Sequence, residues 1–398
     1  MSSGLRIAIV YDRVFPASFG GVERWFRLLA ESLAAEGHQV TYLTTKHWPD
    51  CAVPAIAGTT VIPLRSEDRI YAASRRRMRP VMSFGLSVAR FLARHGESFD
   101  VVHSTTMSPM AALAVVAMAK RCKYVPVLDW WEVWGTAGWH AYLGPATGEI
   151  ASRLEARLAR TDHLPVVYSC LHSARLARLR QRDDALPLAG VLPAEALPPV
   201  AYPAQPYVLM VNRLIPEKQT SSILPALALA RQALPSLRAV IVGSGPLCHE
   251  LQSEIDRFGL REAVIVRDNL NDSELAVLMQ HALCLMLLSR REGFGLVALE
   301  AMRFGTPALV LVHPDSAASE RVVENENGSV VGSLDPPILA SAILSLHASG
   351  NAIRQRTLSW RRDHDSVLTI DHSLPLLVTR YQHGIDERSP VGWRNARP

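Results

Sequence analysis

Residues 289–302 read SRREGFGLVALEAM, and this stretch decides the fold. It follows the apolar run 283–288, whose pattern predicts a buried strand, and its second half has the spacing of a helix. Gly293 and Gly295 lie between the two elements and let the backbone approach a ligand closely. The start of the predicted helix presents free N–H groups that suit an anion. The stretch therefore predicts a strand–loop–helix unit with an anion site at its loop.

Two glutamates flank this loop, and seven residues separate them. Glu292 lies in the loop, whereas Glu300 lies about a turn and a half into the predicted helix. Carboxylates beside an anion site can accept hydrogen bonds from sugar hydroxyls. The alternative is an ordinary turn with two surface glutamates. We favour a binding site because strand, loop and helix agree with the context that such a motif requires.

The rest of the chain alternates short apolar strands with amphipathic helices. Strands are predicted at 5–10, 40–44, 99–103, 124–128, 207–211, 238–242, 263–266, 283–288 and 307–312. Helices are predicted at 22–36, 110–119, 221–233, 247–258, 273–280 and 296–304. This order predicts an α/β fold of two doubly wound, Rossmann-like units, with a cleft between them at the carboxyl ends of the strands.

A run of prolines separates the two series of strands. Residues 187–206 include Pro187, Pro193, Pro198, Pro199, Pro203 and Pro206, and proline disrupts both helix and sheet. We therefore predict an N-terminal Rossmann-like domain at 1–190 and a linker at 191–206. A second Rossmann-like domain would follow at 207–365, with a segment at 366–398 that returns to the first domain.

Composition agrees with a two-domain protein of the cytoplasm. The chain has 398 residues, 48% of them hydrophobic, which is enough for two large cores. Its longest uncharged apolar stretch, 108–119, is too short to span a bilayer, and the first apolar run is too short for a signal peptide. Five scattered cysteines without a CxxC pair indicate reduced thiols and no metal site. The net charge of +5 mildly favours anionic partners and is too weak to indicate nucleic acid.

Three further segments combine glycines with charged residues at predicted turns. Residues 211–218 read VNRLIPEK and contain Lys218, which is one of only four lysines in the chain. Residues 241–246 read IVGSGP, half of a dinucleotide fingerprint without its third glycine, and we interpret them as a tight structural turn. Residues 19–24 read FGGVER and open a predicted helix, and EGHQVT follows that helix at 36–41.

Together these segments resemble the retaining family-4 glycosyltransferases of GT-B fold. The stretch 289–302 is similar to their E-x7-E signature, and 211–218 resembles their G-R-L-x-x-x-K segment, with Asn212 in place of a glycine. Residues 241–246 resemble a strand-ending V-G-x-G-P. The pair 19–24 and 36–41 resembles a G-G-x-E … G-H-x-V-T pattern.

The resemblance implies a role for each matching residue. Glu292 would bind hydroxyls of the donor sugar as part of the catalytic site, and Glu300 would hold the ribose. The loop backbone would serve the sugar and the diphosphate, with the residues Gly293, Phe294, Gly295 and Leu296. Arg213 and Lys218 would neutralise the leaving diphosphate, and Gly20 and Gly21 would touch the donor phosphates from the first domain.

One departure from the family pattern follows the strand at 124–128. Many relatives have a histidine there, whereas this chain continues Asp129-Trp130-Trp131-Glu132, so that Trp131 takes the histidine's place. Asp129 and Glu132 become candidates for binding substrate hydroxyls, and His103, placed after another strand, is a further catalytic candidate facing the cleft. The alternative for His103 is a structural role. The tryptophans either stack on a sugar or pack internally.

Two charged motifs do not fit the resemblance. Asp363-His364-Asp365 imitates the DxD metal motif of another glycosyltransferase fold, but it lies in a polar C-terminal stretch, and we predict no essential metal. Arg75, Arg76, Arg77 and Arg79 precede an amphipathic segment at 81–94. We favour a solvated loop here over a patch that contacts a membrane surface or an anionic acceptor.

The resemblance thus implies a hexosyltransferase that moves a sugar from a nucleotide-diphosphate sugar to a hydroxyl of a small or lipid-linked acceptor, with retention. The acceptor would be a natural product or an envelope precursor. We expect no cofactor, no nucleic-acid partner, and a cytoplasmic location that extends to peripheral contact with the inner membrane. One alternative is a nucleotide-binding accessory protein of the same shape without turnover. A nicotinamide-dependent dehydrogenase is the other, and it would need a complete GxGxxG that the chain lacks.

Overall fold

The computed structural model describes residues 4–49, 54–66, 71–72, 75–76, 78–194, 205–268 and 270–388, with backbone only at 71–72 and 75–76. The chain forms two compact units. Unit 1 comprises the described residues of Met1–Ala194 and Val367–Pro398, and unit 2 those of Glu195–Ser366. Most of the predicted linker, at 195–204, lies outside the described residues.

Unit 1 is built on a parallel sheet. Its seven described strands are β1 (Arg6–Val10), β2 (Gln39–Lys46), β3 (Thr59–Ser66), β6 (Val101–Thr105), β7 (Val125–Trp130), β8 (Leu164–Val167) and β9 (Leu186–Pro187). They lie in the order β3-β2-β1-β6-β7-β8-β9. The order reverses direction between β1 and β6, which is the switch point where ligands bind in such sheets. A two-stranded antiparallel ribbon, β4 (Tyr71–Ala72) and β5 (Arg75–Arg76), is separate from the sheet.

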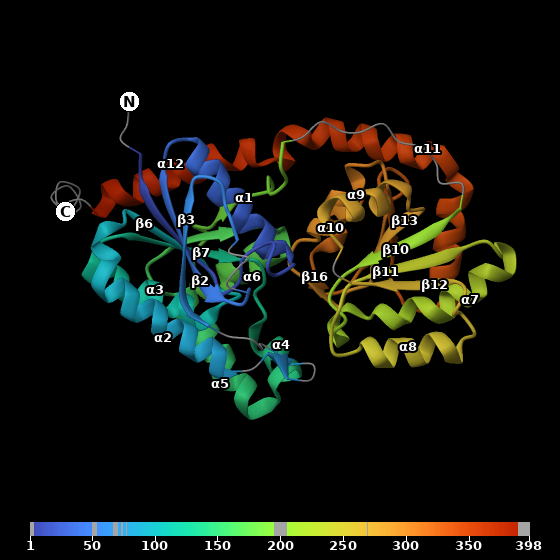
Figure 1. Ribbon diagram of the computed structural model, residues 1–398, viewed down its shortest axis with the longest axis horizontal. Helices are drawn as coiled ribbons and strands as arrows, with labels where there is room; N and C mark the ends of the chain where they lie inside the picture. Colours follow the sequence, from blue (N-terminus) through green and yellow to red (C-terminus); the bar gives the residue numbers. More distant parts are fainter. Residues whose placement is uncertain are drawn as a thin grey trace. The chain divides into compact units, whose positions relative to one another are not determined.

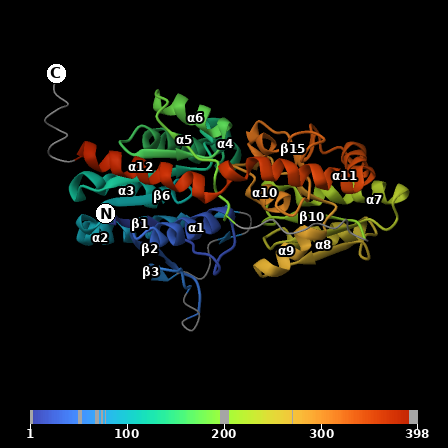
Figure 2. The same ribbon diagram turned by 90° about the horizontal axis from the view of Figure 1, so that it is seen from above.

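Helices cover both faces of this sheet (Figures 1 and 2). They are α1 (Gly21–Ala35), α2 (Met78–His95), α3 (Pro109–Cys122), α4 (Gly135–Leu143), α5 (Pro145–Ala159), α6 (Cys170–Arg180) and α12 (Ile370–Arg388), with a 3-10 turn η1 (Gly96–Ser98). Alternation along the strands decides the partners: Ala8, Val10 and Val102 pack with α2 and α3. The intervening residues face α1 and α12, so the end of the chain completes the core of unit 1.

Unit 2 has a second parallel sheet. Its strands are β10 (Tyr207–Val211), β11 (Arg238–Val242), β12 (Val264–Arg267), β13 (Cys284–Leu287), β15 (Ala308–Leu311) and β17 (Gly328–Val331), in the order β12-β11-β10-β13-β15-β17. Two short strands, β14 (Arg291–Glu292) and β16 (Asp315–Ser316), pair in parallel beyond the sheet. The switch point of this sheet lies between β10 and β13.

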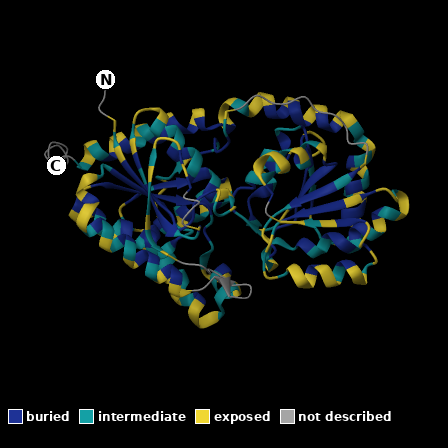
Figure 3. Cartoon of the chain, in the orientation of Figure 1, coloured by how far each residue is buried: buried dark blue, intermediate teal, exposed yellow. Residues whose placement is uncertain are grey.

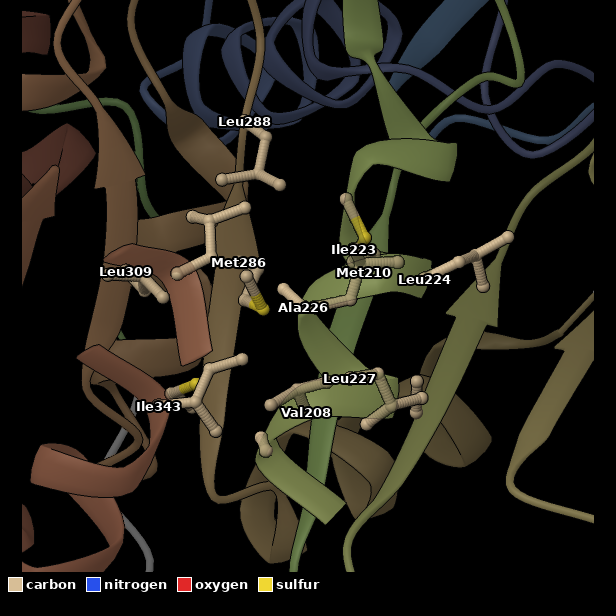
Figure 4. Packing of buried hydrophobic residues seen from close by; sticks show 14 of the residues in the cluster. Val208, Met210, Ile223, Leu224, Ala226, Leu227, Met286, Leu288, Leu309 and Ile343 are labelled. Atoms are coloured by element: carbon tan, nitrogen blue, oxygen red, sulfur yellow. The ribbon is translucent and has the colours of Figure 1, made fainter. Parts of the chain in front are cut away.

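The helices of unit 2 are α7 (Ile223–Ala233), α8 (Cys248–Arg257), α9 (Asp272–His281), α10 (Leu296–Met302) and α11 (Pro336–Leu368), with 3-10 turns η2 (Pro216–Lys218), η3 (Thr220–Ser222) and η4 (Ala318–Arg321). Gly350 interrupts α11 with non-helical φ and ψ of 52° and −132°. Side chains from the strands, α7 and α11 interdigitate in one apolar cluster, which includes Val208, Leu227, Met286 and Ile343 (Figure 4). The central strands β6, β7, β13 and β15 are buried along their length, whereas the edge strands β3 and β12 keep exposed residues (Figure 3).

The predicted α/β fold of two doubly wound units is confirmed. Most of the predicted strands and helices lie within a few residues of the observed ones. The sequence missed β3, β8, β9 and β17, because these strands lie in segments with weak or irregular alternation. No helix among the described residues is both long and apolar enough to cross a membrane.

Candidate functional site

Three loops meet at the switch point of unit 2. One follows β10 and carries Arg213 and Lys218, one follows β11, and the third follows β13 and contains Glu292. The parallel order β11-β10-β13 places the carboxyl ends of these strands next to one another. Lys218 and Glu292, 74 positions apart in the sequence, therefore share one edge of the sheet, as the predicted site requires.

An ion pair joins two of the predicted site residues across this switch point. The Lys218 ammonium donates to Glu292 Oε2 at 2.7 Å. Both side chains are largely shielded, with 16% and 19% of their surface exposed. The low exposure reduces screening by water, so the pair holds the two loops together more firmly than a surface pair would.

Backbone and amide contacts reinforce this connection. The Arg290 amide donates to the Glu217 carbonyl at 2.9 Å. The Gln219 side-chain amide, in its satisfied orientation, donates to the Leu288 carbonyl at 3.2 Å and accepts from Arg290 Nε at 2.9 Å. The sequence analysis missed Gln219 and Arg290. In the sequence, only their position next to the two motifs indicated Gln219 and Arg290 as site residues.

The glycines at 243 and 245 have a structural purpose, as the sequence indicated. A Cβ at Gly243 would lie 1.9 Å from the Asn212 carbonyl oxygen, and one at Gly245 would lie 2.3 Å from that of Leu214. The Leu214 amide in turn donates to the Ser244 carbonyl at 2.9 Å. The loops after β10 and β11 thus touch backbone to backbone, and only glycine permits this approach.

The 293–296 loop is well buried. Gly295 has a φ of 85°, in the left-handed region, and immediately precedes Leu296, the first residue of α10. Phe294 is 2% exposed, and the Arg321 guanidinium stacks over its ring at 4.3 Å. Arg321 comes from η4, outside every motif, so only the fold could reveal its place beside the loop.

Gly293 is buried with the rest of this loop, whereas two other predicted site residues of unit 2 keep more exposure. Glu300 lies half-buried on α10, and Arg213 is exposed on the loop after β10. The Glu292 carbonyl accepts from the Ala317 amide at 2.8 Å, which secures the β14–β16 pairing. Glu292 and Lys218 are therefore fixed in direct contact, whereas Arg213 and Glu300 lie around them on separate elements.

Gly20 and Gly21 lie at the N-terminus of α1 in unit 1. Gly20 is the N-cap residue, and a Cβ there would lie 2.3 Å from Glu23 Oε2. Gly21 is exposed. The buried Glu23 carboxylate therefore folds back over the N-terminus of the 15-residue helix α1, at the carboxyl end of β1.

His103 and Asp129 form a buried network inside unit 1. His103 Nε2 lies 2.7 Å from Asp129 Oδ1, and His103 Nδ1 lies 2.5 Å from the Tyr381 hydroxyl of α12. Trp25 Nε1 donates to Asp129 Oδ2 at 2.9 Å. With the ring proton on Nε2, His103 donates to Asp129 through Nε2–H and accepts from the Tyr381 hydroxyl at Nδ1. Burial, followed by the charge of Asp129, raises the pKa of Tyr381 well above its usual value and keeps this donor protonated.

This placement corrects the expectation that His103 faces a cleft. Both His103 and Asp129 are 0% exposed, because β6 and β7 present them to the face that α1 and α12 cover. Gly384 of α12 approaches so closely that a Cβ there would lie 2.9 Å from Val125 Cγ1. The network therefore attaches the end of the chain to the sheet and has no exposed surface for a substrate.

The tryptophans after β7 divide between packing and partial exposure. Trp131 is 5% exposed and stacks on Tyr168 with ring centroids 3.7 Å apart. Burial, followed by the charge of Asp129, raises the pKa of Tyr168 well above its usual value. Glu132 is half-buried and accepts from Trp134 Nε1 at 2.6 Å. Of the candidates in this loop, Glu132 alone retains exposed surface.

A cavity of about 590 Å³ opens in unit 1 beside the carboxyl ends of β1 and β2. Its lining includes Pro16, Arg27, His47, Trp48 and Pro54. His47 Nδ1 lies 2.7 Å from the Thr45 carbonyl oxygen, and its ring meets Trp48 edge-on. Burial and the neighbouring Arg13 lower the pKa of His47 and favour the neutral ring.

The DxD-like residues 363–365 lie on α11, where Asp365 pairs with Arg361 one turn earlier. Among the described residues, no group of three His, Cys, Asp or Glu side chains is arranged to hold a metal ion.

Family profiles match both halves of the chain. The profile described as "Glycosyl transferase 4-like domain" matches residues 20–185, and that described as "Glycosyl transferases group 1" matches residues 198–357. A GDP-mannose-dependent phosphatidylinositol monomannoside mannosyltransferase of Mycolicibacterium smegmatis is 29% identical over 36% of this chain and 39% of its own length. The glycogen synthase of Mycobacterium tuberculosis is 24% identical over 97% of this chain and 98% of its own length.

Solved structures share the fold. Sucrose-phosphate synthase from Thermosynechococcus elongatus superimposes with a TM-score of 0.76 at 18% identity, covering 95% of this chain and 98% of that one. HepE from Anabaena, solved in complex with UDP-glucose, superimposes with a TM-score of 0.68 at 15% identity, covering 95% and 100% of the two chains.

Proposed function

This chain belongs to the family-4-like glycosyltransferases of GT-B fold, and we propose that it transfers a hexosyl group from a nucleotide-diphosphate sugar to an acceptor hydroxyl. The Lys218–Glu292 pair at the switch point of unit 2 carries the proposal. The names of similar proteins support a nucleotide-sugar donor, since one uses GDP-mannose and another was solved with UDP-glucose.

In the proposed complex the donor separates this ion pair. The Lys218 ammonium would turn to the diphosphate, joined by the exposed Arg213, while Glu292 accepts hydrogen bonds from the sugar hydroxyls. Negative charge grows on the diphosphate as its bond to the sugar breaks, so a cation there stabilises the transition state more than the ground state. Glu300, half-buried on α10, would hold the ribose.

The reaction proceeds with retention at the anomeric carbon. A covalent intermediate would need a free carboxylate beside that carbon, whereas in the proposed complex Glu292 accepts hydrogen bonds from the sugar hydroxyls. Same-face attack, in which the leaving phosphate accepts the proton of the acceptor hydroxyl, requires no such nucleophile. The configuration of the anomeric carbon in the product, determined by NMR, tests this step, and an inverted anomer would refute it.

The acceptor binds to unit 1 in this proposal, at the cavity of about 590 Å³. Its proline and tryptophan lining suits the apolar part of a small or lipid-linked acceptor, and Arg27 and the neutral His47 supply polar contacts. Glu132 offers a second polar group at the carboxyl end of β7.

A thermal-shift panel of UDP, GDP, dTDP and NAD on the wild type and Lys218→Ala tests the donor site. One nucleoside diphosphate should stabilise the wild type, by about 2.7 kcal/mol at a hundredfold excess over Kd. The stabilisation should vanish in Lys218→Ala, and turnover should fall by about 10²- to 10³-fold.

Arg257→Ala is the matched control, because it removes an exposed cation of unit 2 from α8. It should bind and turn over like the wild type. Stabilisation by NAD alone would overturn the proposal. Nucleotide binding without turnover of any NDP-sugar would instead identify an accessory protein.

A further inference from the structure

Helix α2 presents large apolar side chains to solvent. Met78, Met82 and Leu86 are 58%, 50% and 50% exposed, and their four-residue spacing aligns them along one stripe of the helix. An isolated exposed apolar residue is ordinary, but three in consecutive turns of one helix form a patch. Figures 1 and 3 show α2 on the outside of unit 1 with exposed positions along its length.

Arginines continue the same stripe toward the C-terminal end of α2. Arg90 and Arg94 follow at the same spacing, and both are exposed, as is Arg79 in the first turn. Residues 78–95 contain no Asp or Glu, so no carboxylate on the helix offsets these cations. Arg75, Arg76 and Arg77 precede the helix in the sequence, and their side chains lie outside the described residues.

The C-terminal end of α3 adds to this charge. Cys122 Sγ of α3 donates to the Leu92 carbonyl of α2 at 3.3 Å, so the two helices end side by side. Lys120, Arg121 and Lys123 at the end of α3 are all exposed. Glu97, just beyond α2, is an exposed acidic residue close to Cys122.

Packing holds the opposite face of α2 firmly in place. Phe84, Val88 and Leu92 are at most 1% exposed in the core beneath the sheet. Gly85 packs against α3 so closely that a Cβ there would lie 2.6 Å from Met110 Cβ. The helix therefore cannot rotate to bury its exposed stripe, and the apolar–basic face is a fixed feature of unit 1.

We propose that this face, formed by Met78, Met82, Leu86, Arg90 and Arg94 with the end of α3, docks unit 1 onto an anionic lipid surface. Apolar side chains beside arginines, with no carboxylate among them, match the two parts of such a surface: the acyl boundary and the negative headgroups. The sequence analysis favoured a solvated loop for the adjoining arginines. The exposed apolar stripe on α2, invisible in the sequence, reverses that preference.

Sedimentation with vesicles of phosphatidylcholine alone, or mixed equally with phosphatidylglycerol, tests the proposal on the full chain. The wild type should bind the anionic vesicles and lose binding as ionic strength rises. Arg90→Gln with Arg94→Gln should weaken binding about twentyfold, since each basic residue near such a surface contributes about fivefold. Met82→Ser with Leu86→Ser should weaken it about tenfold, through lost apolar burial.

Matched controls separate a specific face from general charge. Arg178→Gln with Arg238→Gln removes two exposed arginines elsewhere, and Val277→Ser removes an exposed apolar residue of α9. Both should bind vesicles like the wild type, and circular dichroism should show every variant folded. Equal binding to neutral vesicles, no binding at all, or an equal loss in the control variants would each overturn the proposal. Retention of binding by the α2 variants would do the same.

Discussion

The two units differ in what packs against their parallel sheets. In unit 1, ionisable side chains bond to one another on one face of the sheet, whereas the core cluster of unit 2 consists of apolar side chains. His103, Asp129 and Tyr381 form a continuous buried network in unit 1. The central cluster of unit 2 consists of aliphatic residues and methionines (Figure 4). The fully buried Arg354 of unit 2 donates to backbone carbonyls of Gln280, Ala282 and Phe304.

The difference follows from how each unit is assembled. Unit 2 is continuous in sequence, so short loops bring its helices to the sheet. Unit 1 includes α12, which comes from the far end of the chain. Directional hydrogen bonds specify the position of that helix better than apolar contact does. Ionisable groups at the carboxyl ends of strands can bind substrate, as proposed for Lys218 and Glu292. Ionisable groups in a core instead specify structure.

The largest effect should come from removing the centre of the buried network. Asp129→Ala leaves the Trp25 indole and His103 without their acceptor, and should lower the free energy of unfolding by about 2–6 kcal/mol, at about 1–3 kcal/mol for each unsatisfied donor. Urea unfolding measures the loss. Asp100→Ala, which breaks the exposed pair with Arg6, should cost less than about 1 kcal/mol. Similar costs for the two variants would refute the role of the buried network.

Acid should lower the stability of unit 1 because of His163. Burial, with help from the charge of Arg180, lowers the pKa of His163 to about 3. The unprotonated Nε2 accepts from Trp130 Nε1. The unfolded histidine binds a proton below about pH 6.5, so stability falls as the pH drops below that value and continues to fall toward the folded pKa. The expected loss between pH 7 and pH 5 is about 2 kcal/mol.

His163→Gln keeps an acceptor for Trp130 and should remove this part of the pH dependence. Urea unfolding at the two pH values gives the comparison, and hydrogen exchange should place the acid-induced loss in peptides of unit 1. Equal acid sensitivity of the wild type and the variant would contradict the assignment, as would a loss confined to unit 2.

The smallest effect should come from the contact that joins α12 to the network. Tyr381→Phe removes the hydroxyl bonded to His103 Nδ1 and should cost about 1 kcal/mol. Hydrogen exchange should accelerate in α12. Tyr42→Phe is the matched control, since its hydroxyl donates to the Arg13 carbonyl at 2.8 Å, away from α12. Unchanged exchange of α12 in Tyr381→Phe, or equal acceleration in both variants, would show that the network does not hold the helix.

The sequence placed site residues best where a motif directly follows a strand. The motifs at 211–218 and 289–302 each lie directly after a strand, so their placement at one sheet edge followed from the α/β pattern. His103 was harder to place, because a histidine after two valines reads the same whether its face of the strand is covered or open. Arg321, Gln219 and the exposed stripe of α2 lacked any motif.

The sequence by itself determined the two doubly wound units and the family, because strand alternation, glycine turns and charged motifs are local patterns that the backbone must obey. Only the tertiary structure decided which polar groups are accessible. It buried His103 and Asp129 beneath α12, joined Lys218 to Glu292, and left Met78, Met82 and Leu86 in solvent. The physical reason is that exposure depends on which distant segment covers a face, and no local pattern records that partner.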